Sequence, residues 1–505
     1  MACIGPVSCR LRAPEDATWH VYCNFKSTGG RIVKKWLGLA LGLGLMAGGV
    51  SSATAAEIKA SGEWAFDLSW TDNLGYRSAA HGDKEDDFNA HQRLRTQIDI
   101  IASENLSGVL FLEMGDSLWG SEDAALGADG KTVKVRRSFV DWNVPGTGLA
   151  VRMGIQGLDL PGATFGASPI LSDEDVAALT LSYAVNDTVA VTGFWARPYD
   201  GANSNAADGN RGFDEVDLFG LSVPVTLDGF SITPHAMYAS IGKDVDGSNF
   251  DENKWNTGSW EAFSDGMHSI AQQHKGVTPG ESSRAWWAGV AFEMSLLSPF
   301  ELKADLTYGT VSNDDEALER SGWLASAMAS YKLDMVTPAV FGWYGSGEDD
   351  DLANGSERMP SVSAQAWAPT SFGFPGSAFQ QDTNFARNGA GLMGVGVQAG
   401  DISFIEDLTH VVRVAYMRGT NDADLLRRDT TLRGDLAPGA GAVFLTDKDS
   451  AWEVNFDHEY KIYENLTMIV EMGLIRLNLD EDAWGDEADN LGTAKKATVN
   501  LVYEF

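Results

Sequence analysis

Cysteine is nearly absent from this chain of 505 residues. The three cysteines are Cys3, Cys9 and Cys23, and none follows them. A disulfide framework and a thiolate metal site are therefore excluded from the remaining sequence.

Basic residues are scarce as well. The sequence has 37 Lys and Arg against 71 Asp and Glu, which gives a formal net charge of −34. Proteins that bind nucleic acid need a basic surface, because they neutralise phosphate groups. The composition therefore argues against a nucleic-acid partner.

Long apolar runs and catalytic signatures are missing too. Outside the N-terminal region no run of about 20 apolar residues occurs, so the body of the chain contains no helical membrane span. We find no Walker-type loop, G-x-S-x-G elbow or H-E-x-x-H motif, and no histidine pair at metal-ligand spacing on a helix. We expect neither enzymatic activity nor a cofactor. The alternative is a hydrolase barrel whose catalytic triad is assembled from distant residues.

The N-terminal region has the pattern of a targeting segment. In "RIVKKWLGLALGLGLMAGGVSSATAA" a basic start is followed by an apolar stretch and by Ala53-Thr54-Ala55. This pattern predicts a signal peptide at residues 31–55, cleaved after Ala55 or Ala56; a short membrane anchor is the alternative. Residues 1–30 do not fit a signal peptide and suggest a non-native or extended upstream segment. Residues 56–505 would then form the functional domain.

Strict alternation of apolar and polar residues marks the body of the chain. In "EIKASGEWAFDLSW" (57–70), Trp64, Phe66 and Leu68 share one parity, whereas Glu63 and Asp67 share the other. The same pattern recurs in "RLRTQIDIIA" (93–102), "LAVRMGIQ" (149–156), "FELKADLTYG" (300–309) and "WEVNFDHEYKI" (452–462). Such alternation predicts β-strands. The polar faces carry too many charges for a sandwich core, so we expect the apolar faces to contact lipid and the charged faces to contact water.

The connections between these segments alternate in length. Short turns are expected at 104–107, 145–148, 186–188, 226–229, 297–300, 333–335, 406–409 and 464–467. Long polar stretches separate them, at 72–90, 117–132, 198–214, 243–282, 346–388 and 420–449. Short turns at one rim and long loops at the other are typical of outer-membrane barrels. The sequence predicts an all-β, closed antiparallel transmembrane β-barrel of about 18 strands, with 16 as the alternative.

The last strand gives a reason for the aromatic residue at the end of the chain. Leu501, Tyr503 and Phe505 share one parity in "LVYEF". This ending resembles the C-terminal strand of bacterial outer-membrane proteins. The resemblance implies recognition by the barrel-insertion machinery and a location in the outer membrane of a Gram-negative bacterium. A closed barrel must also pair its last strand with its first, because lipid cannot satisfy an open strand edge.

A narrower resemblance rests on "FLEMGDSLWG" (111–120), on "RRSFVDWNVPGTGLAVRMGIQ" (136–156) and on the long acidic loops. From roughly Glu57 to Phe505 the chain resembles the homotrimeric outer-membrane porins of sulfate-reducing bacteria. The resemblance implies a homotrimer that acts as a passive diffusion channel for ions and small hydrophilic solutes. The alternatives are a substrate-selective channel for a sugar or an oxyanion, and a structural outer-membrane protein or adhesin.

Four arginines on the polar faces of neighbouring strands are the candidate pore residues. We call Arg93, Arg95, Arg137 and Arg152 the predicted arginine wall. In general porins the loop at the position of residues 157–176 folds into the pore. By that resemblance, we expect the loop to oppose the wall with four acidic residues, namely Asp159, Asp173, Glu174 and Asp175. Opposite charges across a narrow passage filter ions and orient dipolar solutes. The alternative is that the arginines pair with wall carboxylates such as Asp99 and Asp141 and have a structural role.

Two further features call for an interpretation. The acidic loop residues Asp349, Asp350 and Asp351 are weak candidates for binding calcium, or for bridging through divalent cations to lipopolysaccharide, since hard cations prefer oxygen ligands. Their spacing does not match an EF-hand, which favours a solvated loop. Most aromatic residues at strand ends share the outward parity and are expected at the membrane interface. Trp287 has the inward parity and is the candidate for stacking on a solute.

Overall fold

The computed structural model describes residues 10–12, 20–22, 56–77, 86–121, 124–127, 133–200, 214–245, 263–375, 385–438, 443–489 and 491–505. Within the N-terminal 55 residues it describes only a two-stranded sheet, β1 (Arg10–Arg12) and β2 (His20–Tyr22). The predicted signal peptide at 31–55 lies outside the described residues, so its cleavage remains a prediction.

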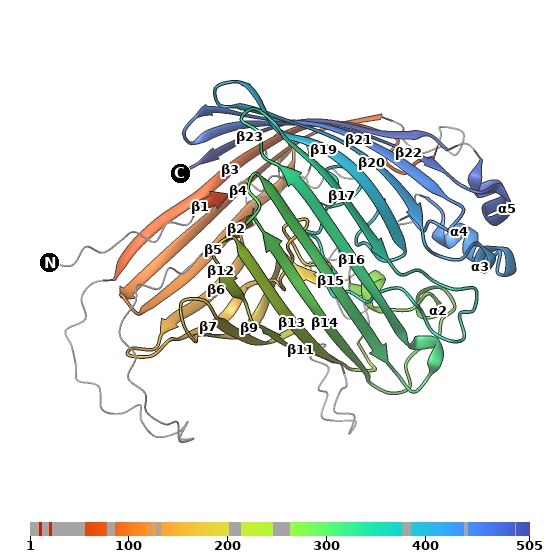
Figure 1. The fold of residues 1–505 in the computed structure, drawn as a ribbon, viewed down its shortest axis with the longest axis horizontal. Coiled ribbons are helices and arrows are strands. Elements are labelled where there is room, and N and C mark those ends of the chain that lie inside the picture. The colour runs from red at the N-terminus through yellow and green to blue at the C-terminus, as the bar shows by residue number, and fades with distance from the viewer. Residues whose placement is uncertain are drawn as a thin grey trace.

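The body of the chain forms a closed antiparallel β-barrel (Figure 1). Its first half contains β3 (Glu57–Asp72), β4 (Asp86–Ser103), β5 (Leu106–Leu118), β6 (Val133–Asn143), β7 (Leu149–Leu158), β9 (Glu174–Ala184), β10 (Ala190–Asp200), β11 (Glu215–Ser222), β12 (Val225–Leu227) and β13 (Phe230–Ile241). Its second half contains β14 (Ser283–Met294), β15 (Phe300–Ser312), β16 (Arg320–Tyr331), β17 (Thr337–Gly345), β19 (Leu392–Ile405), β20 (Leu408–Gly419), β21 (Ser450–Tyr463), β22 (Leu466–Asn478) and β23 (Thr493–Glu504). Because β11 and β12 both pair with β13 as two pieces of one strand, the barrel has 18 strands. The predicted fold is confirmed, and the alternative of 16 strands is wrong.

The barrel closes between β23 and β3, as the sequence predicted. Tyr503 lies opposite Trp64 in the register of these two strands. Beyond β23, the backbone N–H of Phe505 donates to the carbonyl of Gly62, and the N–H of Gly62 donates to the carbonyl of Phe505, both at 3.0 Å. The last residue therefore completes the hydrogen-bonded seam that joins the two ends of the sheet.

Alternation along the strands separates an apolar outer face from a polar inner face. On β3, Trp64 and Trp70 are exposed on the outside, whereas Asp67 and Ser69 are buried on the inside. The same outward exposure is found for the other aromatic residues expected at the interface, namely Trp142, Trp286, Trp452, Tyr503 and Phe505. This is the arrangement required of a barrel surrounded by lipid.

The two ends of the barrel differ. All eight predicted short turns connect consecutive strands, and the chain ends beside one of them, since the N–H of Glu504 donates to the carbonyl of Asn465 at 2.9 Å. The short helices gather at the opposite end, on the right in Figure 1. They are α2 (Ile270–His274), α3 (Ala423–Arg428), α4 (Leu432–Leu436), α5 (Glu481–Trp484), and the 3₁₀ turns η4 (Glu316–Leu318) and η5 (Gly485–Ala488). None of the helices in the described part of the chain is long and apolar enough to cross a membrane.

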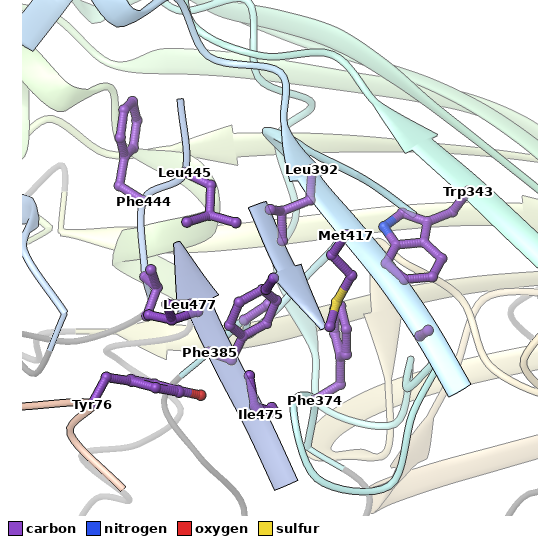
Figure 2. Close-up of a cluster of buried hydrophobic side chains, with 14 of the residues drawn as sticks. Tyr76, Trp343, Phe374, Phe385, Leu392, Met417, Phe444, Leu445, Ile475 and Leu477 are labelled. Atoms are coloured by element: carbon purple, nitrogen blue, oxygen red, sulfur yellow. The ribbon is translucent and has the colours of Figure 1, made fainter. Parts of the chain in front are cut away.

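Inside the barrel, a large apolar cluster joins the wall to the long loops (Figure 2). The ring of Phe374 lies 5.6 Å from that of Trp343 on β17 and 6.1 Å from that of Phe385. Figure 2 draws the rings of Phe374 and Phe385 together with Met417 of β20 and Ile475 of β22, which belong to the same cluster. Phe374 and Phe385 are thus packed within the barrel among buried apolar side chains.

Candidate functional site

A loop between β7 and β9 crosses the interior of the barrel. We call residues 159–173 the first inward loop. Its tip is held by Asp305 on β15, whose carboxylate accepts hydrogen bonds from the backbone N–H of Ala163 at 2.8 Å and of Thr164 at 2.7 Å. Phe165 then packs edge-on against Phe341 and Trp343 of β17, with ring centroids 5.8 and 6.2 Å apart. The loop therefore folds into the barrel at the position that the sequence predicted.

A second segment also enters the barrel, and the sequence analysis missed it. We call residues 359–375 the second inward loop; they belong to the stretch 346–388 that was interpreted as a polar outer loop. Its short strand β18 (Ser363–Ala364) pairs in parallel with β8 (Leu171–Ser172) of the first inward loop. The apolar run "WAPTSFGF" (367–374) was the signal that could have revealed it, because such residues are seldom left in solvent.

The second inward loop reaches the opposite wall, at β21. There Glu453 accepts hydrogen bonds from the backbone N–H groups of Phe372 and Gly373, each at 3.2 Å, and from the hydroxyl of Thr370 at 2.7 Å. Asp457 lies four residues further along β21 on the same face, and it accepts a hydrogen bond from the hydroxyl of Ser371 at 2.8 Å. The expectation of a single inward loop was therefore incomplete, because the described residues include two that meet between opposite walls.

Arginines and carboxylates form a network on the wall built by β4, β5 and β6. Arg95 donates through Nε to Glu113 at 2.8 Å, and Arg93 lies 3.5 Å from Glu63 and 3.4 Å from Asp116. These contacts join β3, β4 and β5 on their lumenal side. Both predicted wall residues on β4 thus lie on the expected face.

A β-bulge adds an arginine that the sequence analysis did not include. Phe111 of β5 is paired with Arg137 of β6, but the next pair is Leu112 with Val135, so Arg136 is the extra residue. A bulge interrupts the strict alternation of faces, and here it turns two consecutive arginines inward. Arg136 donates through Nε to Asp175 at 2.6 Å and through Nη1 to Glu113 at 3.3 Å. We call Arg93, Arg95, Arg136 and Arg137 the arginine cluster.

The first inward loop and the start of β9 supply the carboxylates that meet this cluster. Asp175 bridges Arg136 and Arg137, one carboxylate oxygen to each Nε. Asp173 lies 3.9 Å from Arg137, and its side chain is 54% exposed. Arg137 itself is 27% exposed on its side chain. Arg137 and Asp173 are therefore two partly exposed charges of the network that face each other.

The other two predicted acidic residues have hydrogen-bond partners in the inward loops. Glu174 points away from the arginine cluster, because successive side chains alternate, and it accepts hydrogen bonds from Ser363 at 2.5 Å and Gln365 at 2.9 Å in the second inward loop. Asp159 accepts a hydrogen bond from the backbone N–H of Asp173 at 2.6 Å and closes the base of the first inward loop. Glu174 is therefore not opposite the arginine wall, whereas Asp159 lies beside Asp173 at the base of the loop.

Arg152, on β7, is also separate from the cluster. It makes a bidentate pair with Asp141 of β6, at 2.7 and 2.9 Å, and its guanidinium lies 4.2 Å from the centroid of the Phe139 ring. Such a planar two-bonded contact fixes the guanidinium firmly. For this residue the structural alternative, pairing with a wall carboxylate, describes what is found.

Trp287 has the predicted inward parity but does not line a solute path. It is 2% exposed, and its indole N–H donates to the carbonyl of Pro360 at 2.8 Å. The second inward loop covers it, which is why the proposal of a solute-stacking side chain fails.

The acidic outer loop after β17 is organised by its own backbone. Asp349 accepts from the N–H of Asp351 at 2.8 Å, Asp351 accepts from the N–H of Ala353 at 2.9 Å, and Asp350 pairs with Arg428. The three carboxylates therefore do not converge on one point. In the described ranges no group of three or more His, Cys, Asp or Glu side chains could hold a metal ion.

Glu348, next to these residues, is buried in the same loop. Burial raises the pKa of its carboxyl group to about 7, although a hydrogen bond from the Ser356 hydroxyl opposes the rise. That hydrogen bond is 2.6 Å long and reaches Oε2. Glu348 thus has a carboxyl group whose pKa lies near neutral pH, in a loop outside the strands.

Comparisons with known proteins bear on the fold. No protein-family model matches the chain, and no curated protein matches its sequence. Among solved structures, a BenF-like porin from Pseudomonas fluorescens Pf-5 matches with a TM-score of 0.52 at 9% identity, over 89% of this chain and 98% of that chain. Pseudomonas aeruginosa OccK8 (OprE) matches with a TM-score of 0.49 at 11% identity, over 89% and 98% of the two chains. The first of these likenesses supports a bacterial porin-like barrel fold.

Proposed function

We propose that this barrel is a passive channel in the outer membrane of a Gram-negative bacterium, through which ions and small hydrophilic solutes diffuse. The proposal rests above all on the closed barrel whose outer face is apolar and whose inner face carries the arginine cluster. A charged face of this kind is stable only in contact with water or with partner charges. The proposed mechanism is permeation, without catalysis and without a cofactor.

The passage would be selective by size and charge. The two inward loops occupy part of the lumen, so solutes pass close to the arginine cluster, Asp173 and Asp175. Near a low-dielectric wall each charge acts more strongly on a passing ion than it would in bulk water. The partly exposed charges of Arg137 and Asp173 would orient dipolar solutes.

A second candidate is a channel that selects an oxyanion or a carboxylate. The arginine cluster favours it, because a guanidinium presents donors that match a carboxylate in a bidentate geometry. A sugar is less well supported, since Trp287 is covered. Ion current can be measured while one particular anion is added at low concentration. A block of the current by that anion would indicate a selective channel, and no block would indicate a general one.

Several partners follow from the sequence resemblances and belong to the same proposal. Membership of the porins of sulfate-reducing bacteria would imply a homotrimer. Lipopolysaccharide would surround the outer end of the barrel, and the insertion machinery would recognise the strand that ends at Phe505. Sizing of the protein in mild detergent tests the trimer, and finding only monomer would contradict it.

Reconstitution in a planar bilayer tests the channel itself. We expect discrete conductance steps from the purified, detergent-folded barrel. A folded barrel that inserts but gives no steps would instead favour a structural protein or adhesin, whose function would lie in the outer loops.

A further inference from the structure

Two histidines that are 48 residues apart in the sequence meet on the outside of the barrel. His410 of β20 and His458 of β21 are direct partners in the register of these strands. Their Nδ1 atoms are 2.6 Å apart, and their rings are nearly perpendicular, at 85° with centroids 4.8 Å apart. The two imidazoles therefore aim a nitrogen atom each at a common point.

The surroundings of this pair are apolar and face outward. Its lateral neighbours in register are Ile402 on β19 and Val470 on β22. Along β21 the same face carries Phe456, which is 41% exposed and whose ring lies 4.0 Å from that of His458. Polar groups on such a face are costly unless they are satisfied. A paired imidazole at this position calls for an explanation that core packing does not supply.

The pair lies close to the rim formed by the short turns. Only Leu408 and Thr409 separate His410 from the turn that contains Glu406 and Asp407. Both histidines are half-buried. The pair therefore lies near the turn ends of β20 and β21 rather than at the middle of the barrel wall.

We propose that His410 and His458 form a two-imidazole binding site for a borderline divalent transition-metal ion, of the Zn²⁺ or Cu²⁺ type. Neutral imidazole is a favoured ligand of these metals, whereas calcium and magnesium require oxygen ligands. At tetrahedral Zn–N bonds of about 2.0–2.1 Å, two coordinating nitrogens lie about 3.3 Å apart. Small rotations of the two rings reach this separation from the observed contact.

Binding of a metal ion leaves the number of protons on the two imidazole rings unchanged. Without metal, one Nδ1–H donates to the other Nδ1, so the donor ring carries its proton on Nδ1. With metal, both Nδ1 lone pairs bind the ion, and that ring carries its proton on Nε2 instead, so two neutral imidazoles remain neutral. Water would complete the coordination, since no group of three or more ligating side chains gathers within the described residues.

A bound ion would tie β20 to β21 at the rim. A ligand that binds the folded barrel and not the unfolded chain shifts the folding equilibrium toward the barrel by mass action. The site does not depend on the proposed channel function, because it requires only the folded barrel.

The test uses the full, detergent-folded barrel carrying no histidine tag, with Cu²⁺ and Zn²⁺ as probes. We expect about one ion per barrel and a Cu²⁺ paramagnetic resonance spectrum with two equatorial nitrogens. His410→Gln and His458→Gln should each lower the affinity at least tenfold and leave one nitrogen. His274→Gln, in α2 at the opposite end, is the matched control and should bind as the wild type does.

Folding of each variant is checked by its heat-dependent mobility in gels, so that a loss of binding is not confused with a loss of structure. Equal Zn²⁺ affinity in wild type and His458→Gln would overturn the site. A wild-type Cu²⁺ spectrum with a single nitrogen would overturn it as well. If the barrel binds metal but conducts no ions, the site stands while the channel proposal fails.

Discussion

Asp175 is the carboxylate on which two guanidinium groups of the arginine cluster converge. Its oxygens accept from Nε of Arg136 at 2.6 Å and from Nε of Arg137. Replacing it by asparagine keeps the size of the side chain and removes one negative charge. We expect Asp175→Asn to shift the reversal potential toward anion selectivity, because both guanidinium charges lose their common partner.

The size of this shift follows from the distance at which an ion passes. For a monovalent ion about 5 Å from the lost charge, the Coulomb energy changes by about 0.8 kcal/mol at the dielectric constant of water and by about 3 kcal/mol at an effective value of 20. The lower figure already changes the population of the ion about fourfold. Removing the carboxylate stabilises a passing anion by the same energy by which it destabilises a passing cation. The permeability ratio therefore changes roughly 16-fold even at this lower limit.

Planar-bilayer recordings under a tenfold gradient of a monovalent salt measure the effect. The reversal potential should move by tens of millivolts, within the ~59 mV limit that such a gradient sets. Asp350→Asn is the matched control, because it also removes a carboxylate from an arginine pair, but in the outer loop, where Arg428 is 63% exposed on its side chain. Salt screens such exposed charges beyond about 10 Å at 0.1 M. If the two variants gave indistinguishable reversal potentials, the arginine cluster would not line the passage.

Three further perturbations test the loops and the seam. Asp305→Ala removes the acceptor of two hydrogen bonds from backbone N–H groups of the first inward loop, and each of these bonds contributes about 1.5–3 kcal/mol. The loop should then be held less firmly, so single-channel conductance should rise and its noise should increase. Unchanged current traces would show that packing alone holds the tip of the loop. Deleting Phe505 should lower the amount of protein in the outer membrane far more than it lowers the stability of a barrel folded in detergent, and near-normal membrane levels would contradict this. Since burial raises the pKa of Glu348 to about 7, its contribution to loop stability is complete below about pH 4.5 and is lost as the pH rises through 7. Glu348→Gln should remove this dependence, which amounts to as much as about 3 kcal/mol, as measured by hydrogen exchange of residues 346–358 at pH 5 and 8.

Much of the barrel could be predicted from the sequence because lipid imposes a simple rule. Each strand must present apolar residues outward, so parity alone assigned Trp64 and Asp67 to opposite faces, and the structure agrees. The positions of the short turns follow from the same pattern, since a turn is where the alternation stops and restarts. Closure of the barrel at Phe505 was predictable because lipid cannot form hydrogen bonds with the free backbone groups of an open strand edge.

The interior was predicted less well, because it depends on contacts between distant segments. Parity fails at a bulge, and a single extra residue in β6 brought Arg136 to the inner face beside Arg137. Alternation also sends Glu174 toward the second inward loop while Asp175 meets the cluster. No local pattern reveals that His410 and His458 are partners, since their contact is fixed by the register of two strands.

The inner face itself has two kinds of charged residue, and the sequence does not distinguish them. Asp305 and Glu453 lie on faces that were interpreted as water-facing. Both are almost fully buried, and both accept hydrogen bonds from backbone N–H groups of the inward loops. A loop crossing the lumen leaves N–H groups without partners from its own secondary structure, and these need acceptors. A carboxylate on the facing strand meets that need with a charge-assisted hydrogen bond. Some inward charges thus hold the loops that narrow the barrel, and only those left partly exposed, such as Arg137 and Asp173, remain to act on what passes through it.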